Sequence, residues 1–182
     1  MKWMWLLAPA LLLAGRAQAV DRALFEGMPG IRFQYYEVEG RTAREIYDAM
    51  RARAPRGTEG LAQTIWQIDV DWHEQTRGST CRVLDPRTKL SMTVILPRLR
   101  QVEGMTPEAF RYWRATRRGL EIHEAGHARI AWDHRDDFNR AAQEASCKSI
   151  TQVAKVTQER IEALQQEYDR VTDHGRNQTP AY

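Results

Sequence analysis

Most of the features that mark membrane, nucleic-acid-binding and repeat proteins are missing from this sequence. After residue 13 it has no apolar run long enough to span a bilayer, so it predicts no membrane anchor in the mature chain. Lysine and arginine form no block interleaved with aromatic residues, and charges of both signs are mixed, which argues against nucleic-acid binding. No internal repeat or low-complexity tract is present, which excludes repeat architectures.

Cysteine is also scarce, since the chain contains only Cys81 and Cys147. In an exported protein, which meets an oxidising environment, two thiols commonly pair. We therefore expect one disulfide bond between them, the alternative being two buried free thiols. In a chain-entropy account, closing a loop of this length stabilises the fold by about 4 kcal/mol.

The beginning of the chain has the pattern of a secretory signal peptide. Lys2 gives a short positive start, residues 3–13 are apolar, and Ala17-Gln18-Ala19 is a small-x-small cleavage site. The apolar run is too short for a permanent membrane anchor, and no cysteine follows it to accept a lipid. We expect removal of residues 1–19, leaving residues 20–182 as one domain that is periplasmic or secreted.

The first half of the mature chain has the apolar pattern of β-strands. Residues 31–38 are rich in β-branched and aromatic side chains, and residues 64–72 alternate apolar with polar side chains. Two further strands, residues 81–84 and 88–96, are expected to form a hairpin that turns at Asp85-Pro86-Arg87. These patterns predict a small antiparallel sheet.

Helix signals flank and follow these strands. Thr42-Ala43-Arg44-Glu45 is a capping box, which predicts a short helix that stops at Pro55. Pro97 is expected to end the last strand, and everything after Met105 is predicted to be helical. Thr106-Pro107-Glu108 supplies an N-cap, a first-turn proline and an acidic first turn.

The C-terminal segment carries an apolar stripe that requires a partner helix. The stripe follows steps of three and four residues through Ile150, Val153, Thr157, Ile161, Leu164, Tyr168 and Val171. We therefore expect an α+β fold in which a small antiparallel sheet and one short helix precede a long C-terminal helical hairpin.

The segment His123-Glu124-Ala125-Gly126-His127 has the pattern HExxH inside a predicted helix. Two imidazoles four residues apart project from one helix face and can bind one Zn²⁺ ion, the expected cofactor. Glu124, between them, can hold a metal-bound water and take its proton as a general base. Gly126 costs about 1 kcal/mol relative to alanine inside a helix, which predicts a close approach of another segment there.

A catalytic zinc site usually has three protein ligands, so one ligand is missing from this motif. Asp133 follows His127 by the six residues found in short-loop zincins, but Ile130 stands where those enzymes need glycine. The candidates for the third ligand are Asp133, His134, Asp169, His174 and the distant His73.

Helix lengths favour the C-terminal candidates. If the helix runs on to about Cys147 and reverses, its outward leg of about 30 Å matches a return leg of about 33 Å. His174 would then reach the metal as third ligand, while Asp169 would orient a histidine ligand. Tyr168 would pack in the core or donate a hydrogen bond to a developing oxyanion. The weak step is the turn near Cys147, and a break at residues 133–137 is the alternative.

The order of these features resembles a bacterial family of predicted secreted zinc-dependent proteases, the domain of unknown function 922. The resemblance spans nearly all of the mature chain, and it implies a zincin-like metallopeptidase. The chain departs from the family pattern at Ala54, where a glycine is expected, and in a short connection before Cys147. The matching residues are Tyr36, Val38, Gly40, Thr42, Glu45, Ile46, Thr64, Trp66, Cys81, Leu96, Pro97, Trp113, His123, Glu124, Gly126, His127, Ser146, Cys147, Tyr168, Asp169, Thr172, His174 and Gly175.

These observations predict an exported zinc-dependent endopeptidase acting on a peptide or protein substrate. The expected ligands are His123, His127 and His174, with Glu124 as general base and Tyr168 assisting at the oxyanion. Residues 88–96 are expected to pair with extended substrate as an edge strand. The alternatives are an amide hydrolase directed at peptidoglycan and a non-catalytic envelope protein that zinc or the disulfide stabilises.

Overall fold

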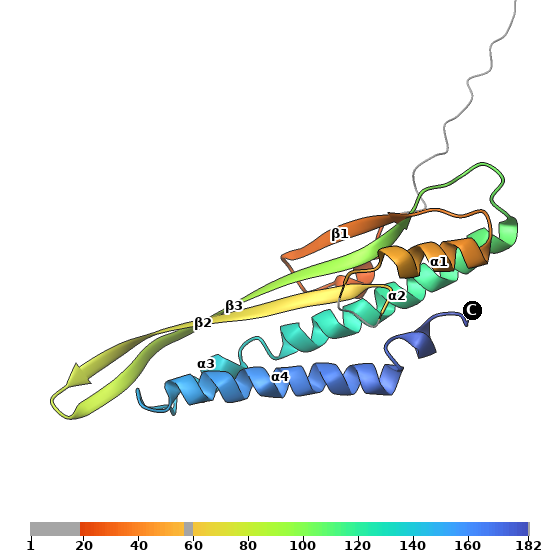
Figure 1. Cartoon of the computed structure of the whole chain (residues 1–182). Coiled ribbons are helices and arrows are strands. Elements are labelled where there is room, and N and C mark those ends of the chain that lie inside the picture. The colour runs from red at the N-terminus through yellow and green to blue at the C-terminus, as the bar shows by residue number, and fades with distance from the viewer. Residues whose placement is uncertain (1–18, 57–59, 182) are drawn as a thin grey trace, which may run out of the picture.

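A computed structural model describes residues 19–56 and 60–181, so the predicted signal peptide lies almost wholly outside the described residues. The expected α+β class is confirmed: one sheet forms a layer, and helices run along it (Figure 1). No helix in the described ranges combines the length and the apolar character needed to cross a membrane. The elements, in chain order, are η1 (Arg22–Phe25), β1 (Ile31–Val38), α1 (Ala43–Arg53), β2 (Gln63–Arg77), β3 (Thr80–Leu99), α2 (Pro107–Asp133), α3 (Asp137–Ala142), α4 (Ile150–Thr172) and η2 (Arg176–Gln178).

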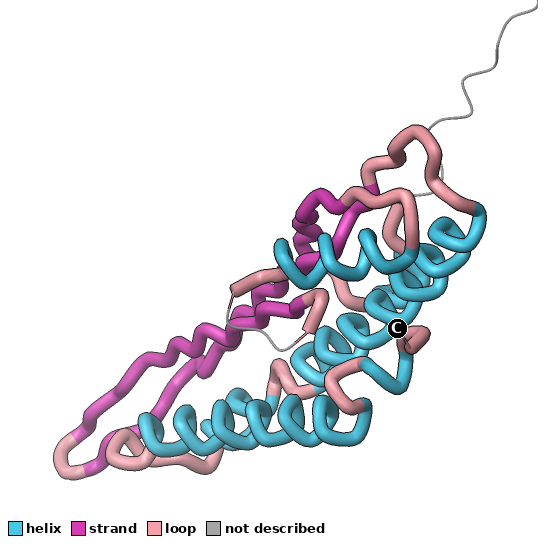
Figure 2. The backbone as a smooth tube through the Cα atoms, turned by 45° about the vertical axis from the view of Figure 1, so that its right-hand side comes forward, coloured by secondary structure: helices cyan, strands magenta, loops and turns pink. Residues whose placement is uncertain are grey.

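The three-stranded sheet is mixed rather than wholly antiparallel, with the order β1-β3-β2. β2 and β3 are antiparallel, but β1 pairs with β3 in parallel, from Ile31 opposite Met92 to Val38 opposite Leu99. A parallel pair requires a long crossover connection, and here α1 and β2 provide it. The β2–β3 ribbon continues well past β1 alongside α3 and α4 (Figures 1 and 2).

The hairpin turn lies earlier in the chain than the sequence predicts. β2 and β3 meet through a two-residue turn between Arg77 and Thr80, in which Gly78 has a φ of 61°. The predicted turn at Asp85-Pro86-Arg87 is wrong, because β3 runs through it without a break.

Asp85 and Pro86 instead form a β-bulge. The ladder register shifts between Asp71 and His73, so these two residues of β3 lie opposite Trp72 alone. Asp85 has a φ of 50°, and a bulge is a place where a strand tolerates a proline without a backbone N–H. The bulge keeps the apolar side chains before and after it on the face toward the helices.

Pro97 does not end β3, contrary to the sequence-based expectation. The strand continues to Leu99, with Pro97 opposite Tyr36 of β1. Because β2 begins at Gln63, opposite Ile95, β3 has a neighbour on only one side at Pro97. No second ladder therefore requires the N–H that proline lacks.

The predicted helix starts are confirmed. Thr42 Oγ1 accepts a hydrogen bond from the backbone N–H of Glu45 at 3.2 Å, and the Glu45 carboxylate accepts one at 2.7 Å from the N–H of Arg41, the residue before the N-cap, in a variant of the capping box. At the start of α2, Thr106 Oγ1 accepts from the N–H of Ala109 at 3.1 Å.

The helix that carries His127 does not run on to Cys147, so that expectation is wrong and the alternative break is the one observed. α2 ends at Asp133, and the short α3 follows. Nδ1 of His134 lies 2.8 Å from Asp137 Oδ2 across the break, and the polar segment offers no apolar side chain to bury. The change of direction brings the buried ring of Phe138 to 5.9 Å from that of Trp72 on β2.

α4 returns beside α2 and completes the predicted helical hairpin (Figure 1). Ile150 and Ile161 of its apolar stripe are buried, whereas Val171 is 58% exposed. The buried position there belongs to Thr172, so the face toward α2 becomes polar at the end of the helix.

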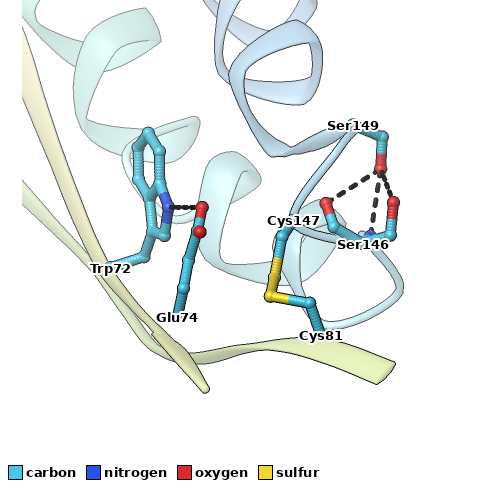
Figure 3. The surroundings of a disulfide bond; sticks show 6 residues. All are labelled: Trp72, Glu74, Cys81, Ser146, Cys147 and Ser149. Carbon is cyan, nitrogen blue, oxygen red and sulfur yellow. Dashed lines mark hydrogen bonds between the residues drawn. A yellow bond between two sulfur atoms is a disulfide. The ribbon is translucent and has the colours of Figure 1, made fainter. Parts of the chain in front are cut away.

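A disulfide bond joins Cys81 and Cys147, with 5.9 Å between their Cα atoms (Figure 3). It ties the beginning of β3 to the turn before α4, where Ser149 Oγ accepts a hydrogen bond from the N–H of Ser146 at 3.0 Å. A small apolar cluster around Phe138 and Ile150 packs beneath the same part of the ribbon. The distal ribbon is thus held to the helices by both a covalent bond and packing.

Candidate metal centre

Three side chains from α2 and α4 converge on one point. Nε2 of His123 and Nε2 of His127 are 3.2 Å apart, and Asp169 Oδ1 lies 3.3 Å from the first and 3.1 Å from the second. The two histidines are one turn apart on α2, and Asp169 reaches them because α4 packs against that face. The one other such group among the described residues contains the disulfide sulfurs: Glu74, Cys81 and Cys147.

Gln165 of α4 fixes the orientation and the tautomer of His127. Its Nε2 donates to the backbone oxygen of His127 at 3.1 Å, which orients the amide, because a carbonyl oxygen only accepts. Oε1 of Gln165 therefore faces Nδ1 of His127, 2.6 Å away. Since this oxygen also only accepts, Nδ1 carries a hydrogen, and in the neutral form of the ring the lone pair is on Nε2, which points toward Asp169.

Thr172 and Gln178 act on His123 in the same way. Thr172 Oγ1 donates to the backbone oxygen of Tyr168 at 2.7 Å, so it accepts from Nδ1 of His123 at 3.4 Å. Gln178 Oε1 lies 3.1 Å from the same nitrogen. Burial lowers the pKa of His123, and neighbouring His127 lowers it further, so the imidazole is neutral at pH 7.

This arrangement suits a cation. With both Nδ1 atoms protonated, two Nε2 lone pairs and a carboxylate oxygen face one another with no hydrogen between them, which is unfavourable unless a positive charge lies there. Zn²⁺ binds nitrogen and oxygen at about 2.0–2.2 Å, which separates tetrahedral ligand atoms by about 3.3–3.5 Å. The observed separations of 3.1–3.3 Å are close to this value, so the residues fit a zinc ion.

Glu124 follows His123 on α2, beside these candidate ligands, and is almost fully buried, with 2% of its surface exposed. Thr64 Oγ1 on β2 lies 2.7 Å from Glu124 Oε2 and 3.0 Å from its backbone oxygen, so the hydroxyl can donate to either. Burial raises the pKa of Glu124 to about 8, and the charge of Asp169 contributes in the same direction. A divalent cation at the adjacent site would instead favour the carboxylate.

Gly126 makes room for Tyr168, which confirms the close approach expected from its position. A Cβ atom on Gly126 would lie 2.1 Å from the Tyr168 hydroxyl oxygen. The tyrosine ring stacks on His123, with ring centroids 5.3 Å apart and an interplanar angle of 15°. Glycine on α2 thus lets α4 approach closely enough for Asp169 to reach the histidines.

We expect Gly126→Ala to destabilise the protein and weaken zinc binding, because the new methyl group overlaps the Tyr168 ring. Overpacking costs about 1–3 kcal/mol, whereas alanine recovers about 1 kcal/mol of helix propensity. Denaturant unfolding and zinc competition titrations would measure the two effects. In a Tyr168→Ala background the same substitution should be neutral or stabilising, and an equal cost in both backgrounds would contradict the packing explanation.

The structure also shows where the remaining predicted residues lie. His174 lines the cavity at the metal site, with Nδ1 3.8 Å from Asp169 Oδ1, but it is outside the group formed by the other three. Asp169, which is expected to orient a histidine ligand, has its Oδ1 facing the Nε2 atoms of both His123 and His127. Asp133 and His134 lie at the α2 break, and His73 is on the distal ribbon.

Sequence reasoning missed Thr64, Gln165 and Gln178. A signal for Gln165 exists, because it lies four residues before Asp169 and four after Ile161, on the face of α4 that turns toward α2. Gln178 follows the end of α4, where helical spacing no longer applies. Its position depends on a run of positive φ angles at Asp173, His174 and Gly175, of 50°, 49° and 80°.

The site opens into a cavity of about 320 Å³ between β2 and the helices. The start of β2, including Gln63, Thr64 and Trp66, forms the wall opposite the histidines. β2 is an edge strand, whereas residues 88–96 lie in the central strand β3. The expectation that residues 88–96 form a free edge is therefore wrong.

Comparison with protein-family models identifies one match, described as a bacterial protein of unknown function (DUF922), over residues 33–175. Comparisons with curated proteins and with solved structures give no match. The matched region contains all but the first two residues of β1, the β2–β3 ribbon, α2 and α4, and therefore every residue of the candidate metal centre except Gln178. Because the match covers well over half of the chain, this protein belongs to the DUF922 family of bacterial proteins.

Proposed function

We propose that the protein is an exported zinc-dependent endopeptidase. The observation that carries this proposal is the convergence of His123, His127 and Asp169 beside the buried carboxyl group of Glu124 in one open cavity. His174 lies close enough to join the ligands after a small movement. The open cavity favours catalysis over a purely structural zinc site, because structural sites are closed by four protein ligands.

The residues of the chain divide the reaction between them. When bound, Zn²⁺ would act as a Lewis acid and lower the pKa of water toward neutrality. Glu124 takes a proton from the attacking water and returns it to the leaving amine. Thr64 holds the Glu124 carboxylate by a hydrogen bond and thereby keeps it aimed into the cavity.

We assign Tyr168 the role of hydrogen-bond donor to the tetrahedral oxyanion. Gln178 Nε2 donates to the Tyr168 hydroxyl oxygen at 3.3 Å, which leaves the O–H hydrogen free to point elsewhere. Burial raises the pKa of Tyr168, so the phenol keeps this hydrogen at neutral pH. Stacking on His123 holds the ring beside the metal position.

The exposed edge of β2 is suited to hold an extended peptide across the site. Residues 63–66 of β2 form one wall of the cavity, and β3 occupies only one side of this strand. A peptide added to the free side would make main-chain hydrogen bonds that do not depend on its sequence. The disulfide further supports export, because such bonds persist in oxidising compartments.

Metal analysis of the purified mature protein, together with a hydrolysis assay on an unfolded protein such as reduced casein, tests the proposal. We expect about one zinc ion per chain and hydrolysis that a strong chelator abolishes and added zinc restores. The chelated protein should remain folded by circular dichroism, because the disulfide and core persist. Absence of zinc from protein purified without chelator, or hydrolysis that survives chelation, would refute the proposal.

A further inference from the structure

A second cavity, of about 500 Å³, adjoins the cavity at the metal centre. It lies between α1, α2 and the segment that follows α4. Most of its wall residues therefore play no part in holding the metal or Glu124, the proposed general base. A group that entered it would lie directly beside the candidate site. The two cavities share wall residues Gly60, Leu61, Leu120 and His174.

The second cavity has an aromatic interior and a positively charged rim. Tyr47 and Tyr112 contribute aromatic rings, Arg51 and Arg176 contribute guanidinium groups, and none of the described lining residues is acidic. Arg176 pairs with Asp173 at 3.1 Å, but both side chains are more than half exposed. Because such exposed pairs are weak, this guanidinium can turn toward another carboxylate.

A buried hydroxyl in the wall also lacks a partner. Thr116 is 1% exposed, and its Oγ1 has no hydrogen-bond partner among the described residues. Leaving a buried hydroxyl unpaired is unfavourable, but this oxygen is closed to solvent, so a group held in the cavity does not reach it. The ligand preference therefore rests on the two arginines and on the absence of acidic residues from the described lining, which point to a ligand with a negatively charged, hydrogen-bonding group.

We propose that this second cavity is a substrate subsite for a carboxylate-bearing residue next to the scissile bond, a proposal that rests on the proposed peptidase function. The carboxylate would pair with Arg51 and Arg176, while the carbon chain of the residue contacts the tyrosine rings. Either an acidic side chain or the C-terminal carboxylate of a peptide supplies this chemistry.

Binding of four peptides to the metal-free protein separates these sources. The peptides are N-acetylated Ala-Ala-Xaa-Ala, with glutamate or glutamine at Xaa and a free or amidated C terminus, and calorimetry gives each affinity. We expect the uncharged amidated glutamine peptide to bind at least about tenfold more weakly than one of the carboxylate-bearing peptides. If replacing glutamate by glutamine weakens binding, the side-chain carboxylate is recognised, and if amidation weakens it, the C-terminal carboxylate is recognised. Equal affinity of all four peptides overturns the proposal.

Variants locate the effect in the cavity. The double variant Arg51→Gln with Arg176→Gln should reduce the difference in affinity between the carboxylate-bearing and the uncharged peptides to about twofold or less. The control Arg170→Gln, which removes an exposed arginine paired with Glu167, should preserve the full difference. Thr116→Val should leave carboxylate binding unchanged, because the hydroxyl is closed to the cavity, and should leave the melting temperature unchanged or raised, because it removes an unpaired hydroxyl. Full discrimination in the double arginine variant would refute the assignment.

The outcome is separable from that of the peptidase proposal, because binding is measured without metal and without turnover. Carboxylate-dependent binding by a protein that never hydrolyses peptides would support the subsite and refute the peptidase. Zinc-dependent hydrolysis by a protein that binds all four peptides equally would support the peptidase and refute the subsite.

Discussion

Glu124→Gln is expected to abolish nearly all peptide hydrolysis while zinc stays bound at about one ion per chain. Glutamine retains the shape of the side chain and can still accept the hydrogen bond from Thr64, but it cannot take a proton. Loss of a general base lowers kcat/KM by about 10²–10⁴-fold. Zinc content by elemental analysis and kcat/KM on one peptide substrate measure the two quantities separately.

Glu108→Gln is the matched control for this substitution. Glu108 lies in the first turn of the same helix, is exposed and is remote from the cavity, so hydrolysis should be unaffected. If Glu124→Gln retains full activity, the general-base assignment fails. If it instead loses zinc, the buried carboxyl group serves to hold the metal rather than to move a proton.

Asp169→Asn should lower zinc affinity by more than about 100-fold, because it removes the one negative charge among the three converging ligand atoms. Even residues behind a metal ligand typically contribute 10–100-fold to affinity, so a direct ligand contributes more. His174→Ala should have a smaller effect, since its Nδ1 is 3.8 Å from Asp169 Oδ1 and outside the converging group. Competition titrations against a zinc chelator of known affinity would rank the two variants.

Asp173→Asn controls for the loss of a nearby negative charge. Asp173 caps α4 in a left-handed conformation that asparagine also adopts, and it pairs only with surface Arg176 among the described residues. Zinc affinity should therefore change little. If His174→Ala lowers zinc affinity more than Asp169→Asn does, His174 is the third ligand, as the sequence predicts, and Asp169 has a supporting role.

Local signals in the sequence predict the elements well but not the points where the chain changes direction. The caps at Thr42 and Thr106 depend on neighbours a few residues away, and both are observed. Asp85-Pro86 is different, because the same residue types occur in turns and in bulges. Only the pairing of Asp71 with Arg87 across the ribbon distinguishes the two.

The candidate site shows the same limit. His123 and His127 are brought together by one helix, so their spacing alone predicts the pair. The third converging side chain comes from a returning helix, and the outward path predicted for the chain is wrong because α2 ends at Asp133. The chain still returns to the site through α3, and the face of α4 that packs against α2 then brings Asp169 to the two histidines. His174 follows the last helical residue, where helical spacing predicts nothing about direction.

The bulge in β3 has a consequence for the length of the chain. Along an unbroken strand, odd- and even-numbered side chains point to opposite faces. In β3 the side chains that face the helices are odd-numbered at Cys81 and Val83 but even-numbered at Leu90 and Met92. Deleting one residue between these pairs would remove the bulge and leave Cys81 facing Cys147, whereas inserting one residue beside the bulge would turn Cys81 away, so this stretch tolerates shortening by one residue but not lengthening by one.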